Sequence, residues 1–155
     1  MANIAQTINV LQAMILTDKE KMILTPTYHV FDMFQQFQDA THLPLELTSK
    51  KYSVGANKMN AISASAALAK NGKVIISLVN VDATKSTDVS CELKGIETGE
   101  ISGQILTAES LNAHNTFDNS ENIKVKDFTD VSVDDGKLLV KMPAKSIVVI
   151  SINKK

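Results

Sequence analysis

The sequence has no tryptophan, no arginine and one cysteine, and only 5% of its 155 residues are aromatic. A single cysteine excludes an internal disulfide and a cysteine-based zinc cluster. Arginine is the preferred side chain for phosphates and base edges, so its absence and the net charge of -1 argue against a nucleic-acid partner. Cys91 lies in an alternating run, and we interpret it as a small buried side chain.

Long hydrophobic runs are also missing, although the chain opens on the apolar stretch MANIAQTINVLQAMILT. Polar residues interrupt this stretch, and Asp18 ends it short of the about 20 residues that a bilayer requires. The first lysine is Lys19, so the stretch lacks the basic start of a secretory signal. We expect no membrane partner, and the sequence leaves the compartment open.

Two parts are predicted, residues 1–43 and residues 44–155, because the pattern changes between them. In the first part, residues 3–16 predict a strand buried on both faces, although a helix is not excluded by the pattern alone. A polar turn is expected at 17–21 and a short second strand at 22–25.

A helix is predicted after this strand. Thr25 suits the N-cap and Pro26 suits the first helical position. The apolar residues expected on one helical face are Val30, Phe31, Phe34 and Phe37. The helix ends before Pro44, which completes a β-turn-β-α unit.

The second part predicts short strands separated by turns, and a long crossover loop at 108–127. Asn71-Gly72 predicts a type I′ hairpin turn, Asp135-Gly136 a further turn, and Pro143 a bend or an edge. The predicted strands are 60–69, 73–80, 86–93, 101–107, 128–133, 137–142 and 145–152. The expected fold class is mainly β, a two-sheet jelly-roll-like β-sandwich preceded by a strand hairpin and one α-helix.

Motifs for chemistry are scarce. The histidines His29, His42 and His114 show no metal-ligand spacing, and there is neither a G-x-S-x-G elbow nor a glycine-rich phosphate loop. We therefore expect no catalytic residue, no metal and no cofactor in this chain. The acidic residues fall in turns and on polar strand faces, which indicates solvated side chains; they include Asp18, Glu20, Asp82, Asp88, Glu92, Asp134 and Asp135.

For two groups of polar residues, the sequence leaves open whether they stabilise the fold or bind a ligand. The loop LNAHNTFD at 111–118 offers groups that bond either a sugar or the loop's own backbone, of which we favour the backbone: Asn112, His114, Asn115, Thr116 and Asp118. Gln6 and Asn9 interrupt the apolar opening stretch. They either satisfy neighbouring backbone or point from a strand end into a site.

Four stretches of the sequence resemble the C-terminal part of family 51 α-L-arabinofuranosidases. They are MANIAQTINVLQAMILT followed by TPTYHVFDMFQQFQ, then VIISLVNVDATKSTDVSCEL, GQILTAESLNAHNTFD and MPAKSIVVISI, in the family's order. The family joins a (β/α)8 barrel to a jelly-roll sandwich. The resemblance implies that residues 1–43 are the remnant of the last barrel strand and helix, and that residues 44–155 are most of the sandwich.

The resemblance also implies a function. The family hydrolyses terminal non-reducing α-L-arabinofuranosyl residues in arabinan- or arabinoxylan-type glycans with retention, using two glutamates on earlier barrel strands that are not in this chain. Because retention needs both carboxyl groups about 5 Å apart, the chain alone is expected to be inactive. Gln6 occupies the position of a family glutamine that binds the arabinofuranosyl unit, so it is a substrate-binding candidate in the complete enzyme only.

The alternative is a stand-alone carbohydrate-binding or interaction module, which the scarcity of aromatic residues disfavours where sugar binding is concerned. Either way, the apolar N-terminal segment needs a cover. We therefore expect it to fold back on the sandwich or to pair with another copy, and we favour a homo-oligomer formed through that segment.

Overall fold

The computed structural model describes residues 3–154, which form thirteen strands, one α-helix and one 3-10 turn. In chain order the elements are β1 (Ile15–Asp18), β2 (Lys21–Leu24), α1 (Pro26–Phe34), η1 (Gln35–Phe37), β3 (Thr41–Leu43), β4 (Lys51–Val54), β5 (Asn57–Asn60), β6 (Ile62–Leu68), β7 (Val74–Asn80), β8 (Thr87–Glu92), β9 (Thr98–Thr107), β10 (Lys126–Asp127), β11 (Val131–Asp134), β12 (Lys137–Met142) and β13 (Ser146–Lys154).

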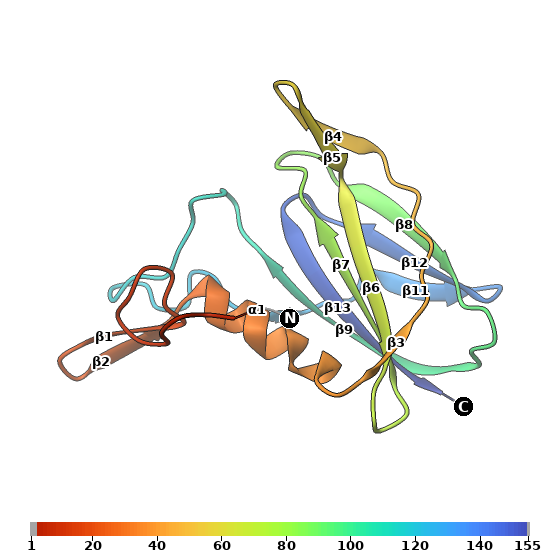
Figure 1. Cartoon of the computed structure of the whole chain (residues 1–155), viewed down its shortest axis with the longest axis horizontal. Coiled ribbons are helices and arrows are strands. Elements are labelled where there is room, and N and C mark those ends of the chain that lie inside the picture. Colours follow the sequence, from red (N-terminus) through yellow and green to blue (C-terminus); the bar gives the residue numbers. More distant parts are fainter. Residues whose placement is uncertain (1–2, 155) are drawn as a thin grey trace.

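Two sheets pack face to face to form a sandwich (Figure 1). The larger sheet has the order β10-β9-β13-β7-β6-β3, and the smaller sheet has the order β11-β12-β8; all pairs are antiparallel. Leu138 and Val140 of β12 meet Val148 and Ile150 of β13 in the core between the sheets. This arrangement confirms the predicted mainly β fold and its sandwich.

The helix α1 covers the outer face of the larger sheet, which makes a third layer (Figure 1). Met33 of α1 is buried against Ile75 of β7 and Val149 of β13. The neighbouring residues Ile76 and Ile150 point into the sandwich core instead. Strands β7 and β13 are therefore buried on both faces, which explains their nearly continuous apolar sequences.

The predicted helix is confirmed, with one change to its buried face. Pro26 begins α1, and the turn η1 extends the helical segment to Phe37. The face that packs on the sheet is formed by Val30, Met33, Phe34 and Phe37. Phe31 was expected on this face but is only half-buried and lies outside the cluster. It follows Val30 directly, so it points about 100° away around the helix axis.

The strand predicted over residues 3–16 is wrong for most of its length. Only β1 is extended, and it forms a hairpin with β2 around a turn at Lys19-Glu20. Asn9 and Gln12 have φ values of 53° and 57°, which an extended strand does not accommodate. Residues 3–14 are consequently irregular, apart from one isolated bridge between Ile8 and Ile15.

The seven strands predicted in the second part are confirmed with shifted ends, as β6, β7, β8, β9, β11, β12 and β13. The short strands β3, β4, β5 and β10 were not predicted. Strands β4 and β5 form an exposed hairpin of largely polar sequence, KYSV and NKMN, with little of the alternation that marks a half-buried strand. Pro143 stands where the chain leaves the smaller sheet for the larger one, which confirms the predicted bend.

The two hairpin turns differ in type. Gly72 N–H donates to the Ala69 carbonyl at 2.9 Å, and Gly72 has a φ of 83° while Asn71 does not have a positive φ. This is a type I turn with a glycine bulge, so the type I′ prediction is wrong although the β6–β7 hairpin is present. Asp135 and Gly136 both have positive φ, 45° and 70°, as the two-residue turn between β11 and β12 requires.

Candidate functional site

The site candidate Gln6 lies on the irregular segment 3–14, and its side chain is exposed. The next residue, Thr7, is firmly placed: its carbonyl accepts the N–H groups of Met14 at 3.0 Å and Ile15 at 3.1 Å. The backbone beside Gln6 is thus tied to the hairpin β1–β2. Within residues 3–154, the Gln6 amide makes no hydrogen bond.

Asn9, the other polar residue considered with Gln6, serves its own segment. Its Oδ1 accepts the Thr17 N–H at 2.7 Å, and its Nδ2 donates to the Thr17 hydroxyl at 2.8 Å. Thr25 adds a second tie, because its hydroxyl donates to the Ala13 carbonyl at 2.7 Å. That hydroxyl was expected to cap α1, and it makes no cap hydrogen bond there.

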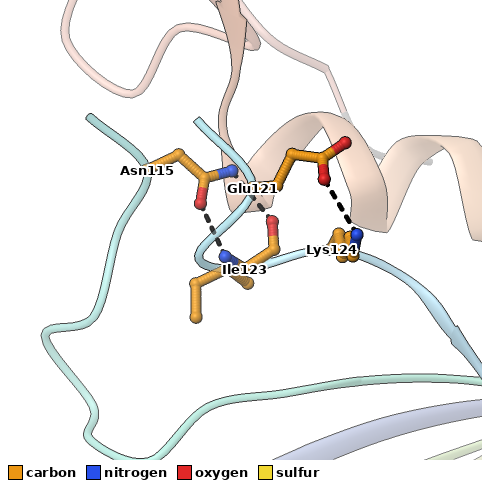
Figure 2. Close-up of polar contacts among 4 residues, drawn as sticks. All are labelled: Asn115, Glu121, Ile123 and Lys124. Atoms are coloured by element: carbon orange, nitrogen blue, oxygen red, sulfur yellow. Dashed lines mark hydrogen bonds and ion pairs between the residues drawn. The ribbon is translucent and has the colours of Figure 1, made fainter. Parts of the chain in front are cut away.

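The loop between β9 and β10 holds the most buried polar side chain of this region, Asn115, which is 4% exposed. Its amide donates to the Ile123 carbonyl at 2.8 Å, and its Oδ1 accepts the Ile123 N–H at 2.6 Å (Figure 2). The same amide also donates to the Leu24 carbonyl at 2.7 Å. Nearby, the Lys124 ammonium bonds the Glu121 carboxylate at 2.9 Å and holds the pKa of that carboxyl below its usual value.

The remaining candidates in this loop are all exposed and differ in the local hydrogen bonds that they make. His114 Nδ1 contacts the Asn112 carbonyl at 2.9 Å, and the Thr116 hydroxyl accepts the Asn119 N–H at 3.1 Å. The side chains of Asn112 and Asp118 are exposed. For Asn115, His114 and Thr116 the structure supports the local interpretation, in which these groups bond the loop's own backbone and hold its shape.

Two concave regions accompany these elements. One is a groove of about 1250 Å³ between the sheets, with walls formed by residues 43–50 and by β8. The other is a polar recess of about 640 Å³ beside the loop after β9, lined in part by Glu109, Asn119 and Asn122. Residues 3–14 line neither of them, so neither recess surrounds Gln6.

Within residues 3–154, the titratable groups form no cluster that resembles a catalytic or metal-binding site. No group of three or more histidine, cysteine or carboxylate side chains in this range is placed to hold a metal ion. Asp82 caps a turn: its carboxylate accepts the N–H groups of Thr84 and Lys85, each at 2.9 Å, and these bonds lower its pKa. The other acidic residues singled out from the sequence are exposed.

Cys91 lies on the core-facing side of β8, where it is half-buried and packs against the sandwich core. Burial raises the pKa of its thiol, and the nearby Glu92 carboxylate raises it further. The thiol is therefore protonated at neutral pH and behaves as a packing group. Among the described residues, no helix is long and apolar enough to cross a membrane.

Comparison with known proteins gives consistent matches. The sequence model for the alpha-L-arabinofuranosidase C-terminal domain matches residues 1–146. An intracellular exo-alpha-L-arabinofuranosidase of Bacteroides ovatus is 44% identical over 153 residues, which are 98% of this chain and 30% of that protein.

Solved structures agree with these matches. The GH51 arabinofuranosidase of Xanthomonas axonopodis pv. citri superposes with a TM-score of 0.95 at 45% identity, over 99% of this chain and 31% of that one. An alpha-L-arabinofuranosidase from Thermotoga maritima, solved as an arabinose complex, has a TM-score of 0.79 at 22% identity, over 95% and 32% of the two chains, and shows the shared fold.

This chain thus spans about a third of the length of the relatives that it matches. Within them it corresponds to the sandwich together with the hairpin and helix that precede it, because the matches cover nearly all of the present chain. The chain belongs to the alpha-L-arabinofuranosidase C-terminal domain family.

Proposed function

We propose that this chain is the non-catalytic C-terminal portion of an α-L-arabinofuranosidase that removes terminal non-reducing α-L-arabinofuranosyl residues, with retention, from arabinan- or arabinoxylan-type glycans. The observation that carries this proposal is the match of 98% of the chain to only 30% of the Bacteroides ovatus exo-enzyme. The family resemblance assigns the two catalytic glutamates to the part that is not matched. Retaining hydrolysis needs both carboxyl groups, so the chain alone has no turnover.

A stand-alone carbohydrate-binding module is the second candidate, and the aromatic side chains argue against it. Sugars in such modules stack on exposed aromatic faces. Here all seven aromatic side chains are buried or half-buried, namely Tyr28, Phe31, Phe34, Phe37, Tyr52, Phe117 and Phe128. A structural role inside the larger enzyme agrees better with this surface.

The two parts expected from the sequence have distinct places in the proposed enzyme. We assign residues 1–43 to the end of the barrel, with the hairpin β1–β2 and α1, and residues 44–155 to the sandwich. Strand β3, at the end of the first part, pairs with β6 in the larger sheet. Together with the packing of α1 on that sheet, this pairing supports a fixed attachment between the two parts.

Gln6 is the substrate-binding residue of this proposal, and its role is tested in a chimera in which this chain replaces the C-terminal portion of the Bacteroides ovatus relative. The chain alone should not hydrolyse a chromogenic α-L-arabinofuranoside, whereas the chimera should. Gln6→Ala should lower kcat/KM of the chimera about 5- to 30-fold, the value of one or two lost neutral hydrogen bonds.

Gln12→Asn is the matched control, because Gln12 is exposed on the same segment and asparagine tolerates its positive φ. It should leave kcat/KM within about twofold of the parent chimera, since no contact with substrate is assigned to it. Purified activity of the chain alone would contradict the non-catalytic assignment. An unchanged kcat/KM in the Gln6 variant would contradict the role of Gln6 while leaving the assignment of the chain intact.

Self-association through the N-terminal segment is a further part of the proposal. Three apolar side chains of this region are exposed: Ile8 at 52%, Leu11 at 95% and Met22 at 62%. We infer that a second copy covers them, because such exposed patches favour association. Light scattering of the chain should give a dimer or larger species, and Leu11→Ser with Met22→Ser should shift it to a monomer.

Val54→Ser is the control for that shift. Val54 is 63% exposed in the β4–β5 hairpin, at the end of the molecule away from β1 and β2 (Figure 1). The substitution removes a similar exposed apolar side chain and should leave the oligomer unchanged. A wild-type chain that is monomeric at all concentrations would overturn the association.

A further inference from the structure

A short series of hydrogen bonds, with one strand pairing between them, joins the sandwich loop after β9 to the segment that carries Gln6. It begins at Asn115, which is 4% exposed and uses both amide donors and its acceptor within the protein. One donor bonds the Leu24 carbonyl at the end of β2. The other donor and the Oδ1 acceptor bond the Ile123 backbone (Figure 2). Asn115 and Leu24 are 91 residues apart in the sequence, so this bond ties the sandwich to the hairpin.

From Leu24 the series continues to the backbone next to Gln6. Leu24 is the register partner of Ile15 in the β1–β2 pair. The Ile15 N–H donates to the carbonyl of Thr7 at 3.1 Å, and Thr7 follows Gln6 directly. Thr25 supports the same stretch, because its N–H donates to Met14 at 2.9 Å and its hydroxyl to Ala13 at 2.7 Å.

These few bonds matter because residues 3–14 have no strand ladder of their own. A segment of this kind opens locally at a low free-energy cost unless specific contacts hold it. The Asn9–Thr17 bonds stabilise the segment internally and do not reach the sandwich. Among these hydrogen bonds, only the one from Asn115 to the Leu24 carbonyl crosses from the sandwich loop to the hairpin.

We propose that Asn115 is a positioning residue, which holds the backbone of Gln6 in place through Leu24, Ile15 and Thr7. The sandwich thereby takes part in orienting a substrate-binding amide from outside the site. This inference rests on the proposed substrate-binding role of Gln6. All the groups in the series are neutral, so the positioning does not depend on the titration of a side chain.

The first test measures hydrogen exchange of this chain. Asn115→Ala should speed exchange of the amides of Met14 and Ile15 about tenfold relative to the amides of β7, which report global opening. Thr25→Val, a nearly isosteric change, should speed the same amides about threefold and serves if the first variant folds poorly. Asn122→Ala is the control, because the Asn122 amide donates to the exposed His114 carbonyl in the same loop. This variant should change the exchange of neither the Met14 amide nor the Ile15 amide.

The second test is a double-mutant cycle in the chimera with the chromogenic arabinofuranoside. Asn115→Ala alone should raise KM about 3- to 30-fold, the range of coupling energies carried by such networks. In the Gln6→Ala background it should have little further effect, because the residue that it positions is already absent. Thr25→Val should show the same non-additivity to a smaller degree. Asn122→Ala should leave KM unchanged in both backgrounds.

The outcomes separate the two claims. An equal effect of Asn115→Ala with and without Gln6 would show a general structural role and overturn the inference, while an effect of Gln6→Ala alone keeps the proposed function. Unchanged exchange at Met14 and Ile15 in both Asn115→Ala and Thr25→Val would also overturn it. A folded but inactive parent chimera would instead contradict the proposed function itself.

Discussion

Replacing Leu138 by alanine is expected to lower the free energy of unfolding by about 3 kcal/mol, because a fully buried leucine loses both its transfer energy and its packing. Leu138 is 0% exposed and lies on β12, the central strand of the smaller sheet. Its register partners are Val133 on β11 and Cys91 on β8, so its side chain is enclosed from both neighbouring strands and by the larger sheet. The side chains around Leu138 therefore have little freedom to move into the cavity that Leu138→Ala would leave.

The next residue provides the control. Leu139 is 37% exposed on the opposite face of β12, and Leu139→Ala should cost less than about 1 kcal/mol because little apolar area is returned to water. Urea unfolding of both variants followed by circular dichroism measures the difference. Equal losses of stability would show that the smaller sheet does not pack on the larger one as described.

Asn80→Ala is expected to lower the free energy of unfolding by about 2–4 kcal/mol, because it leaves several buried polar groups without a hydrogen-bond partner at once. Asn80 is 1% exposed at the end of β7. Its amide donates to the carbonyls of Lys85 at 3.0 Å and Pro143 at 2.8 Å, and its Oδ1 accepts the Asp82 N–H at 3.0 Å. One side chain thus fixes the turn after β7 and the connection between the two sheets.

Asn71→Ala is the comparison for this loss. Asn71 is exposed in the β6–β7 turn and accepts one bond, from the Lys73 N–H at 3.2 Å. Solvent can replace that bond, so the expected cost is below about 1 kcal/mol. Thermal unfolding of the two variants should separate them clearly. A similar melting temperature for both would show that the Asn80 bonds contribute nothing beyond those of an exposed turn.

The strands of the sandwich were predictable because their patterns carry the information locally. Residues 86–93 alternate, and in the structure Val89 and Cys91 contact the core while Ser90 and Glu92 are exposed. Pro26 likewise marked the start of α1. Each of these signals depends only on the periodicity of a few neighbouring residues or on the geometry of one proline.

The N-terminal segment was not predictable in this way, because its pattern and its backbone disagree. Its apolar residues indicate a buried strand, while the left-handed conformations of Asn9 and Gln12 break the extended chain. Asparagine adopts such a φ more readily than most residues, which was the one available signal. The role of Asn115 was equally hidden, since a single sequence does not show that residue 24 lies beside residue 115.

The position of β13 has a consequence for how the chain acquires its structure. This strand is the last in the described order, yet it lies between β9 and β7 and pairs with both. Until it inserts, β7 and β9 each keep an open edge, and α1 has no complete surface on which to rest. Closure of such distant pairs is slow, so nascent chains are exposed to edge-to-edge aggregation until the last strand has emerged.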